Sequence, residues 1–138
     1  MTGVQTCALP IFDFHKLDAT ERKRAIGEFG GHLMAAVGGV VPVLPVPLVA
    51  TVVLAHEAAG ISEFELKVEV NALIERLEAA GAHTYIPRKD LDYAVGVGLR
   101  MLTLRHLVEE KDGLYAPRQI ELPLLRYYAN SIAHFLPA

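Results

Sequence analysis

Six histidines are the side chains of this chain best suited to acid–base or metal chemistry. His56 and Glu57 begin the pattern His-Glu-x-x-His, in which two histidines on one helix face hold zinc and the glutamate acts as a base. The fifth position of the pattern is Gly60, so the second metal ligand is missing. The remaining histidines are scattered, and we interpret them as polar tips on half-buried faces. The sequence therefore predicts no metal site.

Other motifs of catalysis and cofactor binding are also incomplete. Gly96 and Gly98 begin a Gly-x-Gly-x-x-Gly pattern, but Met101 stands in the last place and the pattern lies within a predicted helix. Helix packing explains these glycines better than a dinucleotide loop does. No Gly-x-Ser-x-Gly motif and no phosphate-loop lysine motif occurs, and Cys7 has no credible histidine partner. We expect no catalytic residue and no cofactor.

Length and composition favour one folded domain without a nucleic-acid partner. The chain has 138 residues, of which 52% are hydrophobic, and a formal net charge of −3. Thirteen basic side chains are outnumbered by sixteen acidic ones, and no basic cluster stands out. An acidic balance of this kind opposes binding to a phosphate backbone.

The first eleven residues, MTGVQTCALPI, look like a translated sequencing adapter in which a GTG codon is taken as the start. A signal peptide is the competing interpretation, but the segment lacks a basic beginning and a proper apolar centre. We therefore expect residues 1–11 to be an artefact, and residues 12–138 to be the natural, incomplete polypeptide.

The stretch from Val40 to Gly60 is almost wholly apolar and must be covered. Its uncharged run is about long enough to cross a bilayer, which takes roughly 20 helical residues. Pro42, Pro45 and Pro47 interrupt such a helix, because proline lacks the amide donor. The sequence instead predicts a buried core helix from Pro47 to Ala59, closed by Gly60, with a membrane-embedded segment as the alternative.

Capping residues and apolar periodicity predict the other elements. Ser62 and Glu65 form a capping box, with Ile61 and Leu66 as a hydrophobic staple. The buried stripe that follows is Leu66, Val70, Leu73, Ile74 and Leu77, with Gly81 as the stop. The remaining predicted elements are a helix capped by Asp18 and ended by Gly38 and Gly39, a strand His83–Ile86, a central helix from Leu91 to about Leu107 capped by Asp90, a hairpin of 106–110 and 114–117 around Asp112-Gly113, and a last helix from about Pro123.

The predicted last helix has two distinct sides. Leu124, Tyr128, Ile132 and Phe135 lie on the side expected to face the core, whereas Tyr127, Asn130, Ser131 and His134 share another side at helical spacing. A polar side of this kind commonly faces water. The alternative is that these four polar residues contact another domain of the same chain, and they are our candidate site.

The fold class predicted is mainly α with a small β-hairpin. The element order from Pro47 to Pro117 suggests a winged-helix-like arrangement with the hairpin as its wing, and hence a DNA-binding or protein-interaction module as an alternative function. The helix from Leu91 to Leu107, which would enter the DNA groove, offers few donors beyond Arg100 and Arg105. A membrane-surface protein would need a basic face opposite the apolar one, which the helix from Pro47 lacks.

Three separated stretches resemble one protein family. The run from Leu125 to His134, LRYYANSIAH, is similar to the closing Tyr-Tyr-x-Asn-x-Ile-Ala-His string of the membrane-bound bacterial glycerol-3-phosphate acyltransferases. The segment Val41–Ala50 and the hairpin 109–114 look like the same carboxy-terminal region, so the resemblance covers most of residues 12–138.

The resemblance implies a parent enzyme that transfers an acyl group from acyl carrier protein or coenzyme A to glycerol 3-phosphate, at the cytoplasmic face of the bacterial inner membrane. The family's general base belongs to a His-x4-Asp pair. No histidine of this chain is followed by aspartate at that spacing. We therefore expect a helical, non-catalytic carboxy-terminal domain whose partner is the missing amino-terminal catalytic domain.

Overall fold

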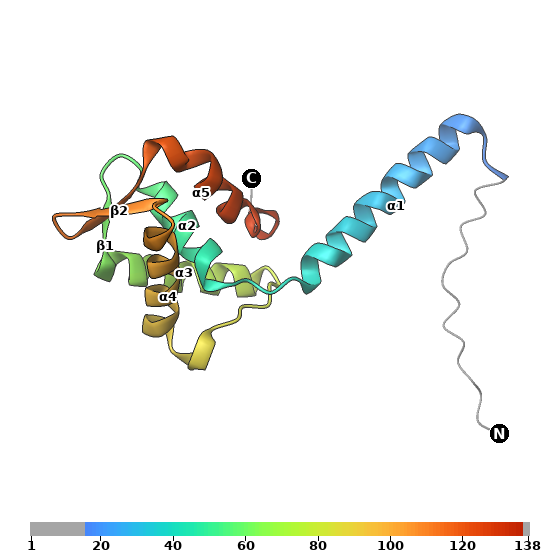
Figure 1. Ribbon diagram of the computed structural model, residues 1–138. Helices are drawn as coiled ribbons and strands as arrows, with labels where there is room; N and C mark the ends of the chain where they lie inside the picture. The colour runs from blue at the N-terminus through green and yellow to red at the C-terminus, as the bar shows by residue number, and fades with distance from the viewer. Residues whose placement is uncertain (1–15, 137–138) are drawn as a thin grey trace, which may run out of the picture. The chain divides into compact units, whose positions relative to one another are not determined.

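The computed structural model describes residues 16–136 (Figure 1), and it confirms a mainly helical chain with a small antiparallel sheet. The chain divides into two compact units, one ending at Val37 and the other beginning at Gly38, and each is described by itself. The boundary predicted at residue 11 lies outside the described residues. In chain order the elements are α1 (Ala19–Val40), α2 (Pro45–Ala55), β1 (Ile61–Ser62), α3 (Glu63–Ala79), η2 (Pro87–Lys89), α4 (Leu91–Leu104), β2 (Val108–Lys111), β3 (Leu114–Pro117), η3 (Gln119–Glu121), α5 (Leu122–Asn130) and η4 (Ala133–Phe135).

Helix α1 begins at the predicted cap and has no buried residue. The Asp18 carboxylate accepts hydrogen bonds of 2.8 Å from the backbone N–H groups of Thr20 and Glu21, which otherwise lack helical partners. The predicted end at Gly38 is wrong, because the helix continues to Val40. A glycine inside a helix costs only about 1 kcal/mol relative to alanine, which is too little to end the helix by itself.

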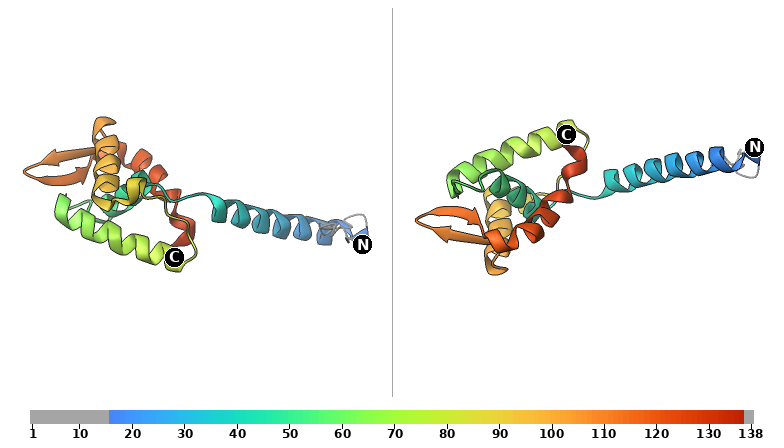
Figure 2. Two further views of the ribbon diagram at one scale, coloured as in Figure 1. Left: turned by 90° about the horizontal axis from the view of Figure 1, so that it is seen from below. Right: turned by 90° about the horizontal axis from the view of Figure 1, so that it is seen from above.

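Helix α2 is the centre of the second unit and packs against α3, α4 and α5 (Figure 2). The predicted core helix is confirmed, but it begins at Pro45 and ends at Ala55 rather than at Pro47 and Ala59. Both prolines fit the first turn, where N–H groups have no partner within the helix. No helix among residues 16–136 has both the length and the hydropathy of a membrane span. The buried residues of α2 are Pro45, Leu48, Val49, Ala50, Val52 and Val53.

The predicted capping box, buried stripe and end of helix α3 are all confirmed. The Ser62 hydroxyl accepts the N–H of Glu65, and the Glu65 carboxylate accepts the N–H of Ser62, which completes the capping box. The five residues of the predicted stripe are its buried residues. Gly81 ends the helix with φ +88°, and the N–H of Ala82 reaches back to the carbonyl of Leu77 at 2.9 Å.

Helix α4 is capped by Asp90 as predicted, but it ends at Leu104 instead of about Leu107. His106 adopts the left-handed conformation, with φ 58°, that usually belongs to glycine at a helix end. The helix packs against α2, α3 and β2, but it is not buried all round, because Met101 and Leu104 are exposed. Its apolar residues are therefore divided between a buried side and an outward side.

Only one of the two α4 glycines allows close packing. A Cβ atom on Gly98 would lie 2.8 Å from Cγ2 of Val49 and 2.9 Å from the carbonyl oxygen of Pro45, whereas a Cβ on Gly96 would meet nothing within 4 Å. The prediction that glycine permits a close approach is confirmed at Gly98 and wrong at Gly96.

The sheet contains the predicted hairpin and one strand more. Asp112 and Gly113 have φ of 53° and 78°, as a tight turn between β2 and β3 requires. Strand β1 pairs with β3 through Ile61 opposite Tyr115, which gives the order β1-β3-β2. From α2 onward the α-helices and strands follow the order helix, strand, helix, helix and two strands, which is consistent with the winged-helix-like arrangement that the sequence suggests.

The predicted strand His83–Ile86 is wrong. Only a single parallel bridge joins Thr84 to Val43, with hydrogen bonds of 2.8 and 2.9 Å between the backbones. Pro42 and Pro45 stand on either side of Val43, and because proline donates no hydrogen bond, the ladder cannot extend.

Helix α5 starts at Leu122, close to the predicted Pro123, but ends at Asn130 before the 3-10 turn η4. Leu125 is fully buried, whereas Leu124, assigned to the core side, is exposed. Ile132 is buried as predicted, although it lies beyond the helix. The single continuous helix face predicted for residues 124–135 is therefore wrong.

Candidate interaction site

Three of the four candidate residues lie together at the end of α5. Tyr127, Asn130 and Ser131 line a shallow cleft of about 290 Å³ together with Tyr128. Tyr127 is 72% exposed, and Asn130 and Ser131 are exposed as well. The cleft is thus lined by an aromatic ring, an amide and a hydroxyl group.

The fourth candidate, His134, is set apart by the change from α5 to η4. Its Nε2 lies 3.2 Å from the carbonyl oxygen of Gly38, and its ring lies 4.0 Å from that of Phe135. The Ser131 hydroxyl donates to the carbonyl oxygen of Tyr128 at 2.8 Å. The loss of helical geometry after Asn130 thus separates His134 from the cleft that the other three residues line.

Tyr128 packs against the core, as the sequence predicts, and it also borders this cleft, which the sequence does not predict. It is half-buried, and its hydroxyl accepts a hydrogen bond from Arg105, the residue that follows α4. Its ring also borders a second, mainly apolar cleft of about 240 Å³, lined by Leu44, Val46, Pro47, Met101, Leu102 and Arg105. A tyrosine on an apolar face has a hydroxyl that needs a partner, which is the signal that could have identified it.

The histidine tested as a zinc ligand is instead paired with a carboxylate. Nε2 of His56 lies 2.8 Å from Oε1 of Glu69. Glu57 contacts Gln119 at 3.3 Å and Arg126 at 3.7 Å. No group of three or more His, Cys, Asp or Glu side chains within residues 16–136 is arranged to hold a metal ion.

Two charged side chains have shifted pKa values that report on local contacts. The pKa of Glu65 is lowered by its hydrogen bonds to the Ser62 side chain and backbone. The pKa of Lys67 is raised because its ammonium lies 2.9 Å from Glu63 and 3.3 Å from Asp92. The lysine therefore ties α3 to the first turn of α4.

The winged-helix arrangement does not carry the charges that duplex DNA requires. The β2–β3 hairpin, which would be the wing, exposes three acidic side chains, Glu109, Glu110 and Asp112, and one basic side chain, Lys111. On α4 and its C-cap, the apolar Met101 and Leu104 are exposed beside only two cations, Arg100 and Arg105. Phosphate contacts dominate the affinity of DNA-binding domains, so this surface is unfavourable for a nucleic acid.

The fold and the exposed cleft define a small, mainly helical module of winged-helix-like arrangement with an accessible polar and aromatic surface. The chain belongs to the family described as the glycerol-3-phosphate acyltransferase C-terminal region, whose match extends over residues 13–137. This confirms the family that the three sequence stretches resemble. No curated protein matches the chain. No solved structure matches it either.

Proposed function

We propose that this chain is the non-catalytic carboxy-terminal portion of a glycerol-3-phosphate 1-O-acyltransferase. The observation that carries the proposal is the family match over residues 13–137. The parent enzyme would transfer an acyl group from acyl carrier protein or coenzyme A to glycerol 3-phosphate, in phospholipid biosynthesis, at the cytoplasmic face of the bacterial inner membrane. The chain's own role would be to brace a catalytic domain that carries the His-x4-Asp pair.

The cleft at the end of α5 supports this bracing role. Tyr127, Asn130 and Ser131 are exposed here and line one cleft. When one partner of a hydrogen bond across an interface is removed, the other polar group stays buried without a partner. This destabilises the interface by about 1–3 kcal/mol. The energetic effect of this surface should therefore appear in the complete enzyme and be small in the present chain.

Two measurements test the proposal. The purified chain should transfer no radiolabelled acyl group to glycerol 3-phosphate, and turnover that survives rigorous purification would overturn its non-catalytic assignment. In the complete enzyme, Asn130→Ala and Tyr127→Ala should lower stability or activity, because both side chains line the exposed cleft, while the same changes leave melting of the present chain nearly unaltered. Glu109→Ala, on the exposed side of β2, is the matched control in both proteins.

The same substitutions can also contradict the docking of this surface on a catalytic domain. If Asn130→Ala and Tyr127→Ala unfold the present chain, these side chains stabilise its own fold. A protein-interaction module unrelated to acyl transfer is the second candidate, and the winged-helix arrangement favours it. In that case removing this region from the complete enzyme would leave acyl transfer intact.

A further inference from the structure

A third cleft, which shares no lining residue with the cleft at the end of α5, lies between α3 and the segment that leads into α4. Its volume is about 660 Å³, which is within the range of pockets that hold small ligands. The apolar side chains of Ile74, Ile86 and Leu91 line it, together with the basic side chains of Arg88 and Lys89. The cleft thus combines an apolar surface with two basic side chains.

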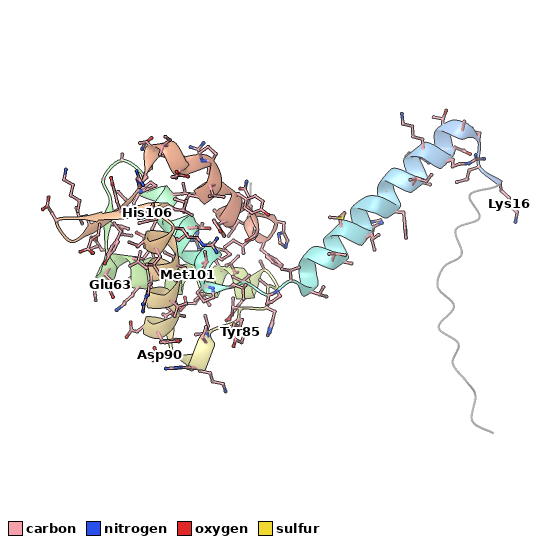
Figure 3. All side chains as sticks on the ribbon, in the orientation of Figure 1. Lys16, Glu63, Tyr85, Asp90, Met101 and His106 are labelled. Atoms are coloured by element: carbon pink, nitrogen blue, oxygen red, sulfur yellow. The ribbon has the colours of Figure 1, made fainter. Side chains whose placement is uncertain are left out.

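The backbone at these two basic residues is unusual. Arg88 and Lys89 both adopt positive φ, of 59° and 54°, in the turn η2 between the Tyr85 and Asp90 side chains labelled in Figure 3. The N–H of Lys89 donates to the carbonyl oxygen of Ile86, and that of Asp90 to Pro87. A turn with two successive residues of positive φ favours glycine or asparagine at those positions, which Arg88 and Lys89 occupy here.

Long cationic side chains therefore stand where folding alone would favour smaller residues. The Arg88 guanidinium stacks 4.3 Å from the centre of the Tyr93 ring, which accounts for part of its placement. The Lys89 side chain makes no hydrogen bond or ion pair within residues 16–136, and neither does the nearby His83 side chain. Backbone strain of this kind persists most often where the side chains serve a ligand.

The acidic side chain at the cleft does not neutralise these cations. Glu78 also lines it, but its carboxylate accepts a hydrogen bond from the Thr84 hydroxyl. No ion pair joins Glu78 to Arg88 or Lys89 in the described chain. The positive charges of η2 remain available to an incoming anion.

We propose that this cleft binds a monomeric amphipathic anion, a molecule with an acyl or alkyl chain and a phosphate or carboxylate head. The head would pair with Arg88 and Lys89, and the chain would lie against Ile74, Ile86 and Leu91. This ligand site is separate from the docking surface on α5, and it does not depend on the acyl transfer proposed above.

Binding of octyl phosphate and of octanoate, each below its micelle concentration, tests the proposal on the present 138-residue chain. Titration followed by NMR should show saturable binding, with shift changes centred on residues 71–91. Inorganic phosphate and octyl glucoside, which lack the chain and the charge respectively, should each bind at least tenfold more weakly. Equal binding of octyl glucoside, or no binding of either anion, would overturn the proposal.

The double variant R88N/K89G separates a ligand role from a structural one. It places favoured residues in the turn, so melting should stay unchanged or rise while affinity for octyl phosphate falls at least tenfold. His106→Gly is the matched control, because it relieves positive φ away from the cleft and should leave affinity unchanged. Unchanged affinity in R88N/K89G, or binding confined to phosphatidate vesicles without binding of monomers, refutes the assignment.

Discussion

Replacing Gly98 with alanine perturbs the closest approach of α2 and α4 by one methyl group. That methyl would lie 2.8 Å from Cγ2 of Val49, which a small rotation can relieve. It would also lie 2.9 Å from the carbonyl oxygen and 3.1 Å from the carbonyl carbon of Pro45, and these backbone atoms cannot move unless α2 moves. The two helices must therefore separate slightly to accept the substitution.

Two opposing terms decide the size of the effect. Alanine improves helix propensity over glycine by about 1 kcal/mol. Overpacking a well-packed contact costs about 1–3 kcal/mol. Because Gly98 is buried and the clash includes backbone, we take the upper part of that range. Gly98→Ala should lower the free energy of unfolding by about 1–2 kcal/mol as the net of these terms.

Gly96→Ala supplies the control within the same helix. Its methyl meets nothing within 4 Å, so only the propensity term acts and stability should rise by about 0.5–1 kcal/mol. Urea unfolding followed by circular dichroism measures both variants. A change of 1 kcal/mol corresponds to about 4–8 °C in Tm for a domain of this size. If Gly98→Ala is as stable as Gly96→Ala, the close helix contact is not a determinant of stability.

Two further predictions concern the helix caps and the amino terminus. Ser62→Ala should destabilise the chain by about 1 kcal/mol in urea titrations. Because the pKa of Glu65 is lowered from its usual 4.5, its contribution is present above that pH and is lost as the pH falls through the lower, folded-state pKa. Stability measured between pH 5 and about 3 should fall less in Ser62→Ala than in the natural sequence, and an equal fall would contradict this. Deleting residues 1–11 should leave Tm unchanged, and a loss of several degrees would show that they pack against the fold.

The features that sequence predicted correctly are those encoded within a few residues. The Ser62–Glu65 capping box, the Asp90 cap and the Asp112-Gly113 turn each need only local hydrogen bonds or backbone dihedrals. The buried stripe of α3 follows from helical periodicity. These elements therefore keep their predicted places whatever packs against them.

The features that sequence reasoning missed depend on contacts distant in the chain. His106 adopts a positive φ, typical of glycine, at the end of α4. A histidine in the sequence does not predict this conformation. Strand β1 exists because β3 pairs with it, and a two-residue strand has no pattern of its own. Tyr128 is positioned by Arg105, 23 residues earlier. The grouping of Tyr127, Asn130 and Ser131 without His134 likewise follows from where α5 ends.

The order β1-β3-β2 has a consequence for behaviour at high protein concentration. Each outer strand of a sheet presents unpaired backbone groups on which a second molecule could add a strand. Here one outer strand, β1, has two residues, and the other, β2, carries Glu109, Glu110 and Lys111. Short length and repeated charge are the features by which natural sheets resist edge-to-edge aggregation. Self-association of this domain should therefore arise from the exposed apolar side chains of its helices, and surfactant should suppress it more effectively than salt.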